Sequence, residues 1–134
     1  MPAQSPTRTI LIVDEAHDHR DIISRLLRAT GYRVVESDPG ESALDRADRE
    51  EPDLILMSLS LPGQPAWETT RALRAHPALG STPILGATML TTLLSHSHLR
   101  ALGCADYIAK PFDLDALLER IDALLPDAPP ALAA

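Results

Sequence analysis

The sequence has very few aromatic residues and only one cysteine. Aromatic side chains make up 3% of the 134 residues, so aliphatic side chains and alanine must fill the core. The single cysteine, Cys104, excludes an internal disulfide framework and fits a reducing compartment. Because it follows Gly103 at an expected helix end, we interpret it as a small buried residue rather than a reactive thiol.

Long hydrophobic runs and a surplus of basic residues are also missing. No apolar stretch reaches the roughly 18 to 20 residues of a membrane span, and the first residues lack a signal-peptide pattern. The formal net charge is −7, which argues against binding to nucleic-acid phosphates. We therefore expect a cytoplasmic protein with no membrane or nucleic-acid partner, whose partners are other proteins.

The composition, with 45% hydrophobic and 23% charged residues, fits one compact domain. Proline and small polar residues predict a flexible arm at 1–8 and a disordered tail at 126–134, on either side of a domain at 9–125. Buried-strand and amphipathic-helix patterns alternate five times, which predicts an α/β fold with a doubly wound parallel sheet and helices on both faces. The expected strands are 9–13, 32–36, 54–58, 82–87 and 105–109, and the expected helices are 18–30, 41–50, 66–75, 89–102 and 114–125.

The first expected helix has a clear apolar pattern. Ile22, Ile23, Leu26 and Leu27 are spaced to form one apolar face. We expect this face to cover the sheet.

The central apolar run, within PDLILMSLSLPG, ends at Ser58. In open α/β sheets, sites are built at the carboxyl ends of the strands. The other strands are expected to bring Asp14, Glu15, Thr88 and Lys110 to the same edge. The hydroxyl of Ser58 is therefore the critical group of the predicted site.

Each of these edge residues also has an ordinary interpretation. Asp14 and Glu15 could hold Mg²⁺, which binds through one or two carboxylates plus waters, or could form a solvated acidic turn or a helix cap. Lys110 could be a fixed cation or a surface lysine. Thr88 could offer a hydroxyl to an anion or simply end its strand.

The histidines form two pairs at i, i+2 spacing, His17 with His19 and His96 with His98. This spacing does not place two ligands on one helical face, which needs i, i+4. We interpret all four as exposed polar residues rather than as a zinc site.

The order of these motifs along the chain is specific. The segments ILIVDE, PDLILMSLSLPG, TPILGAT and ADYIAKPF occur in that order. Over about 9–125, the chain resembles the receiver (CheY-like) domain of bacterial two-component response regulators. The resemblance implies a flavodoxin-like fold with five strands in the order 2-1-3-4-5.

The resemblance also implies roles for individual residues. Asp14 and Glu15 match the acidic pair that helps to hold Mg²⁺. Thr88 matches the hydroxyl residue that senses the phosphoryl group, and Tyr107 matches the aromatic residue that changes rotamer on activation. Lys110 matches the lysine that pairs with the acceptor carboxylate.

Ser58 departs from the family pattern, because it stands where the family has the phospho-acceptor aspartate. A serine hydroxyl needs a general base to become a comparable nucleophile. Losing the third carboxylate should weaken Mg²⁺ binding and relieve charge repulsion, so that Lys110 can pair with Asp14 or Glu15. We therefore expect no cofactor, weakened Mg²⁺ binding and a metal-free protein that is folded.

The favoured hypothesis is a stand-alone pseudo-receiver that acts in signal transduction through protein–protein contacts. Its partner would be a histidine kinase, another regulator or an output protein. In the family, the fourth helix, fifth strand and fifth helix form the contact surface, and two charged positions there are used in dimers. These considerations predict a monomer or weak homodimer and a partner face of Leu99, Asp106, Tyr107, Leu114, Leu118 and Arg120.

Two other hypotheses remain. In the first, the domain is switched by another phosphorylation, either of Ser58 by a serine/threonine kinase or of another residue. A phosphoserine at 58 would carry a charge of about −1.5 to −2, which Thr88 and Lys110 could bind. In the second, the chain is a flavodoxin-like enzyme that binds a flavin or nucleotide. The Asp14–Glu15 pair disfavours the enzyme, because it would repel phosphate where a Gly/Ser/Thr-rich cradle is needed.

Overall fold

The computed structural model describes residues 7–59, 65–89 and 96–125. The predicted tail at 126–134 and residues 1–6 of the predicted arm lie outside the described residues. Strands and helices alternate as predicted. They are β1 (Thr9–Val13), α1 (His17–Ala29), β2 (Arg33–Ser37), α2 (Glu41–Glu50), β3 (Leu54–Ser58), α3 (Pro65–Ala75), β4 (Ile84–Thr88), α4 (His96–Leu102), β5 (Asp106–Ala109) and α5 (Leu114–Leu124).

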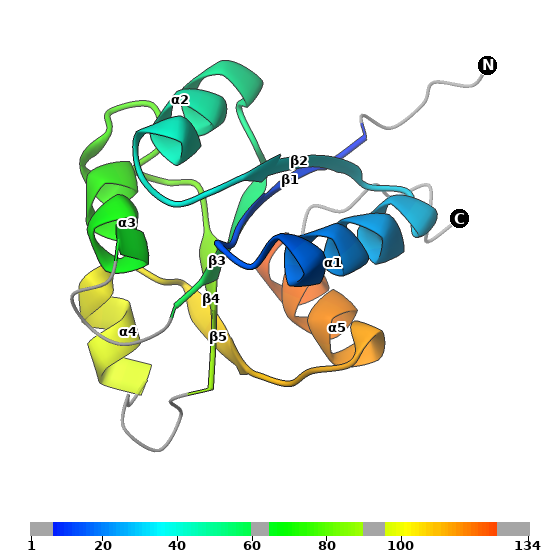
Figure 1. Cartoon of the computed structure of the whole chain (residues 1–134). Coiled ribbons are helices and arrows are strands. Elements are labelled where there is room, and N and C mark those ends of the chain that lie inside the picture. The colour runs from blue at the N-terminus through cyan, green and yellow to red at the C-terminus, as the bar shows by residue number, and fades with distance from the viewer. Residues whose placement is uncertain (1–6, 60–64, 90–95, 126–134) are drawn as a thin grey trace.

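The strands form one parallel sheet in the order β2-β1-β3-β4-β5. This confirms the predicted order. Helices α1 and α5 cover one face of the sheet, and α2, α3 and α4 cover the other (Figure 1). Among the described helices, none is both long and apolar enough to cross a bilayer.

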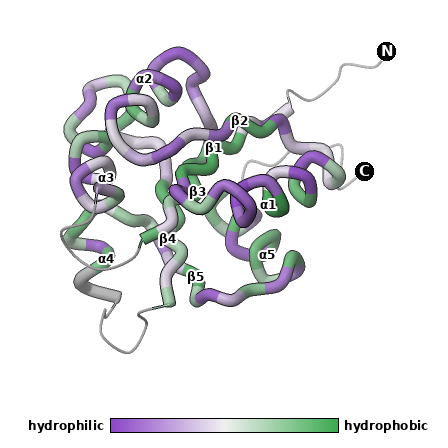
Figure 2. Tube along the Cα trace, in the orientation of Figure 1, coloured by the Kyte–Doolittle hydropathy of each residue, from purple (hydrophilic) through white to green (hydrophobic). Residues whose placement is uncertain are grey.

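Each face of the sheet carries its own core, because successive residues of a strand point to opposite faces. In β1, Ile10 and Ile12 join a cluster with residues of α1 and α5, whereas Leu11 and Val13 join a cluster with residues of α2, α3 and α4. All residues of β1, β3 and β4 are buried, as expected for strands covered on both faces. Hydrophobic residues accordingly follow the central strands, while much of α2 is hydrophilic (Figure 2).

Several element boundaries differ from those predicted. Helix α3 begins at Pro65, because proline suits the first helical position, where no N–H partner is needed. Strand β4 begins at Ile84 rather than at residue 82, since Pro83 has no N–H to donate to the sheet. The fourth helix was predicted to start at Met89. In the structure, α4 spans His96–Leu102, and Met89 itself is not helical.

The predicted apolar face of α1 is only half correct. Ile23 and Leu27 are buried against the sheet, whereas Ile22 is 56% exposed and Leu26 is 38% exposed. Ser24 takes a buried position instead. The helix is therefore turned so that one i, i+4 pair faces the core, and the apolar spacing alone did not fix this rotation.

Gly103 ends α4 beside the side chain of Arg74, which holds the loop before β4. The Arg74 guanidinium donates hydrogen bonds to the carbonyl oxygens of Gly80 at 2.9 Å and Leu79 at 3.2 Å, and also to that of Thr82. Gly103 has a φ of +120°, and a Cβ there would lie 2.2 Å from Arg74 Cγ. A side chain at 103 must therefore displace Arg74.

We predict that Gly103→Ala lowers the free energy of unfolding by at least about 2 kcal/mol, through the positive φ and the loss of Arg74 hydrogen bonds. Gly31→Ala is the matched control, because Gly31 has a φ of +104° with nothing within 4 Å of its added Cβ. It should cost only about 1 kcal/mol. Urea unfolding of both variants measures the difference, and equal losses would contradict the role given to Arg74.

Candidate functional site

Asp14 follows β1 at the carboxyl edge of the sheet and is 3% exposed. Its Oδ1 accepts a hydrogen bond from the Ala16 N–H at 2.8 Å, and its Oδ2 lies 2.7 Å from His19 Nδ1. Arg20 Nη1 donates to the Asp14 carbonyl oxygen at 2.7 Å. Ala16 and the first turn of α1 therefore hold Asp14 at its main chain and at both carboxylate oxygens.

Ser58 and Lys110 complete this cluster. Ser58 ends β3 and is 6% exposed. Lys110 Nζ donates a hydrogen bond to Ser58 Oγ and lies 3.9 Å from Asp14 Oδ2. The Lys110 N–H also donates to the carbonyl oxygen of Thr88 at 2.8 Å. The structure thus brings together Asp14, Ser58, Thr88 and Lys110 of the predicted edge residues, and the predicted pairing of Lys110 with Asp14 is present.

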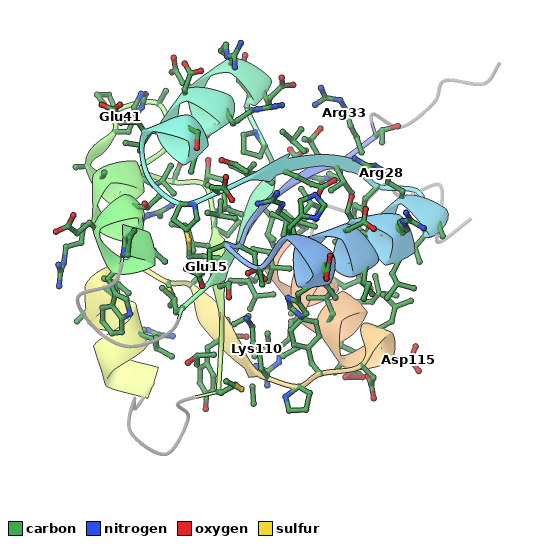
Figure 3. The ribbon with its side chains drawn as sticks, in the orientation of Figure 1. Glu15, Arg28, Arg33, Glu41, Lys110 and Asp115 are labelled. Atoms are coloured by element: carbon green, nitrogen blue, oxygen red, sulfur yellow. The ribbon has the colours of Figure 1, made fainter. Side chains whose placement is uncertain are left out.

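Glu15 has a different environment from Asp14. Its side chain is exposed, and Figure 3 shows Glu15 and Lys110 near the ends of β1 and β5 on one edge of the sheet. Glu15 is therefore the solvent-facing member of the acidic pair.

A small cavity lies inside the cluster. It has a volume of about 10 Å³ and is lined by Asp14, His19, Ser58, Lys110, Phe112 and neighbouring apolar residues. The rings of His19 and Phe112 meet edge to face, with centroids 6.0 Å apart and an interplanar angle of 73°. A cavity of this size holds about one water molecule.

The carboxylates available to Mg²⁺, which the family resemblance implies, are one buried and one exposed side chain, Asp14 and Glu15. The described residues include no group of three or more His, Cys, Asp or Glu side chains that could hold a metal ion. Mg²⁺ requires near-octahedral oxygen ligands. The Oδ1 and Oδ2 atoms of the buried Asp14 already contact the Ala16 N–H and His19 Nδ1, so a metal at Asp14 would compete with these donors.

The two remaining switch residues lie on neighbouring strands. Thr88 is fully buried at the end of β4. Tyr107 of β5 is half-buried and packs against the core on the α2, α3 and α4 side of the sheet. Their roles in switching remain predictions.

The predicted partner face needs one correction. Leu99 is 1% exposed and belongs to the core, so its assignment to an exposed face is wrong. The inward side of α4 carries Leu99 against the sheet. Leu114 and Leu118 are half-buried against the α1 and α5 side of the core, which leaves part of each accessible.

The two charged residues of this face pair with each other. Arg120 Nη1 donates to Asp106 Oδ2 at 2.9 Å and to Oδ1 at 3.1 Å. Arg120 is exposed, and Asp106 is half-buried. These charges therefore satisfy each other within one chain.

His19 was interpreted from the sequence as an exposed polar residue, yet it is a central part of the cluster. Its side chain is 40% exposed, with Nδ1 bonded to Asp14. Its distance of five residues from Asp14, in the first turn of the following helix, was the available signal. His17 is exposed as predicted, and the side chains of His96 and His98 lie outside the described residues.

Cys104 is 4% exposed, which confirms that it is a buried residue. Burial raises the pKa of its thiol to about 11, and the nearby Arg74 opposes this rise. A thiol with so little thiolate at neutral pH is a poor nucleophile.

Comparison with known proteins identifies the family. Residues 10–122 match the model of the response regulator receiver domain, and the chain belongs to this family. It is 31% identical over 122 residues to the polar-differentiation response regulator DivK of Brucella ovis, covering 91% of this chain and 99% of that protein.

Solved structures agree. The chemotaxis response regulator CheY4 of Vibrio cholerae superposes with a TM-score of 0.80 at 28% identity, covering 90% of this chain and 100% of that one. The receiver domain of the sensor histidine kinase PA1611 of Pseudomonas aeruginosa has a TM-score of 0.78 at 31% identity, covering 91% and 100%. That structure has a magnesium ion coordinated in its active-site cleft.

We predict that Lys110→Met lowers the free energy of unfolding by about 1–2 kcal/mol, because the buried Asp14 carboxylate loses its ammonium partner. In an Asp14→Asn background the loss should be smaller, which gives a coupling energy of about 1 kcal/mol. The lost hydrogen bond to Ser58 is common to both backgrounds and cancels. Metal-free urea unfolding of the four proteins measures the coupling.

Glu15→Gln supplies the control for this cycle, because Glu15 is exposed. Its coupling to Lys110 should be close to zero, as expected for solvent-screened charges. Equal coupling of Lys110 to Glu15 and to Asp14 would contradict the arrangement described above.

Proposed function

We propose that this receiver-family protein is a pseudo-receiver, which signals without phosphorylation of an aspartate at the carboxyl end of β3. The observation that carries this proposal is the contact between Lys110 Nζ and Ser58 Oγ. The residue that occupies the expected acceptor position is a hydroxyl, and the hydroxyl accepts a hydrogen bond from a cation. Such a hydrogen bond draws electron density away from the oxygen and does not remove its proton.

Among the described side chains, no carboxylate is hydrogen-bonded to Ser58 Oγ, whose partner is Lys110 Nζ. A serine nucleophile requires a neighbouring group that takes its proton. Asp14 is the carboxylate of the cluster, but its oxygens accept hydrogen bonds from Ala16 and His19, and Lys110 lies 3.9 Å away. A carboxylate engaged in these contacts is poorly placed to take the proton of Ser58. The arrangement supports a hydroxyl that stays unreactive toward acyl phosphates.

A protein of this kind would act as a regulator through its surface, and not as an enzyme. Receiver domains interact with histidine kinases and with other proteins. We place the contact on the α4–β5–α5 face, here defined by Asp106, Tyr107, Leu114, Leu118 and Arg120. The partner would be a histidine kinase, another regulator or an output protein, in the cytoplasm.

The same face argues for a monomer. A dimer that used Asp106 and Arg120 would have to break the pair that they make within one chain, at 2.9 and 3.1 Å. Exchanging one satisfied ion pair for another contributes little net free energy. At most, a weak homodimer is expected.

Phosphorylation of Ser58 by a serine/threonine kinase is the alternative. Lys110 would stabilise a phosphoserine, because its ammonium already contacts the Ser58 oxygen. However, Ser58 is only 6% exposed, so a kinase would have to open the cluster to reach it.

We predict that the natural protein gains no phosphoryl group from a small acyl-phosphate donor with Mg²⁺, as read by intact-mass analysis. Ser58→Asp restores an ionised nucleophile and should gain at least a fraction of one phosphoryl group. Phosphorylation of the natural protein under these conditions would contradict the proposal. Protein purified from its native cells with a phosphoryl group on Ser58 would favour the alternative instead.

A second prediction concerns the α4–β5–α5 face. Tagged protein carrying Arg120→Asp should lose a partner that co-purifies from native cells, because the substitution reverses an exposed charge on this face. Arg49→Asp is the control, since Arg49 is also an exposed arginine paired with an aspartate, Asp45, at 3.0 Å, but lies on α2.

Both variants should remain folded and show the same oligomeric state as the natural protein in sedimentation velocity. If Arg120→Asp retains every partner that Arg49→Asp retains, the contact surface lies elsewhere. If the natural protein is a dimer that Arg120→Asp dissociates, the intrachain pairing does not preclude assembly.

A further inference from the structure

The contact between His19 and Asp14 fixes the protonation of the histidine. An ionised carboxylate only accepts hydrogen bonds, so the His19 Nδ1 at 2.7 Å from Asp14 Oδ2 must carry a proton. His19 is therefore a donor to the same oxygen that Lys110 Nζ approaches at 3.9 Å. One oxygen of the buried carboxylate thus faces two donors from different elements.

The position of His19 is set by several contacts. Asp14 Oδ1 accepts the Ala16 N–H at 2.8 Å, which turns the chain into α1 and brings the first helical turn back over the carboxylate. Phe112, from the loop before α5, packs edge to face against the imidazole ring. The ring is therefore held from two elements, and its hydrogen bond to Asp14 belongs to a built arrangement.

A cation at Asp14 Oδ2 would compete with His19 for this oxygen, because His19 Nδ1 already lies 2.7 Å from it. Mg²⁺ binds through one or two carboxylates and keeps several waters. Binding of Mg²⁺ at Asp14 Oδ2 would therefore require His19 to leave both its hydrogen bond and its contact with Phe112.

We propose that His19 competes with a divalent cation for Asp14, so that two residues, Ser58 and His19, both weaken metal binding at this edge of the sheet. The proposal deepens the proposed function and rests on its claim that the site does not support phosphorylation of an aspartate. It implies that a carboxylate at position 58 alone restores Mg²⁺ binding only in part. Removing the imidazole as well should release Asp14 Oδ2 for the ion.

Isothermal titration with MgCl₂ tests this in three full-length proteins: Ser58→Asp, Ser58→Asp with His19→Ala, and Ser58→Asp with His17→Ala. Removing His19 should raise the Mg²⁺ association constant about tenfold, because binding no longer breaks a hydrogen bond to a charged group. Removing His17, whose exposed ring lies 3.8 Å from Asp18, should change it less than about twofold. Equal affinities in all three proteins would overturn the proposal.

A second measurement needs no variant at position 58. In the natural protein, ¹⁵N-detected NMR of the imidazole should show His19 protonated at Nδ1, and Asp14→Asn should change the Nδ1 signal. A His19 with an unprotonated Nδ1 in the natural protein would overturn the proposal even if a variant failed to fold. Failure of this proposal about His19 is distinct from failure of the proposed function, because the proposed function is tested by phosphorylation of the natural protein.

Discussion

The buried carboxylate of Asp14 is the constraint on which the edge of the sheet depends. A carboxylate that is 3% exposed is costly unless donors and positive charge compensate it. The compensation comes from two sides: Ala16 and His19, at the start of α1, contact the two carboxylate oxygens, and Lys110 approaches one of these oxygens from the end of β5. Arg20 in addition holds the main-chain carbonyl of Asp14. One charge therefore ties together segments about 100 residues apart in sequence.

The parts of this arrangement that the sequence predicted are those that follow from topology. Alternating buried strands and helices predicted a parallel sheet, and its carboxyl edge must collect whatever residues end the strands. Asp14, Ser58, Thr88 and Lys110 could therefore be placed together without knowledge of any side-chain contact. The neutral hydroxyl at 58 also led to the expectation that Lys110 would pair with an acidic neighbour, as it does with Asp14.

The errors arose where the rotation of a helix decides which residues are covered. The apolar spacing of α1 fitted several rotations, and the packing selected the one that buries Ile23 and Leu27 and exposes Ile22. Leu99 was assigned to an exposed face from the family's contact surface, without knowledge of the rotation of α4, which turns it into the core. The rotation of α1 also brings His19 over Asp14, so a residue that resembled a solvated histidine became part of the site. Such rotations depend on tertiary packing, which local patterns do not encode.

A site closed in this way affects how such a domain could switch. A ligand shifts an equilibrium between two conformations only by the difference between its affinities for them. If neither a metal nor a phosphoryl group binds at Asp14 and Ser58, neither can supply that difference, and Thr88 and Tyr107 receive no signal from the site. The free energy for any rearrangement must then come from contacts at the surface, where a partner binds one arrangement of the α4–β5–α5 face more tightly than another. On this argument, His19 and Lys110 keep the edge of the sheet in one state, and the partner determines whether the face has a second one.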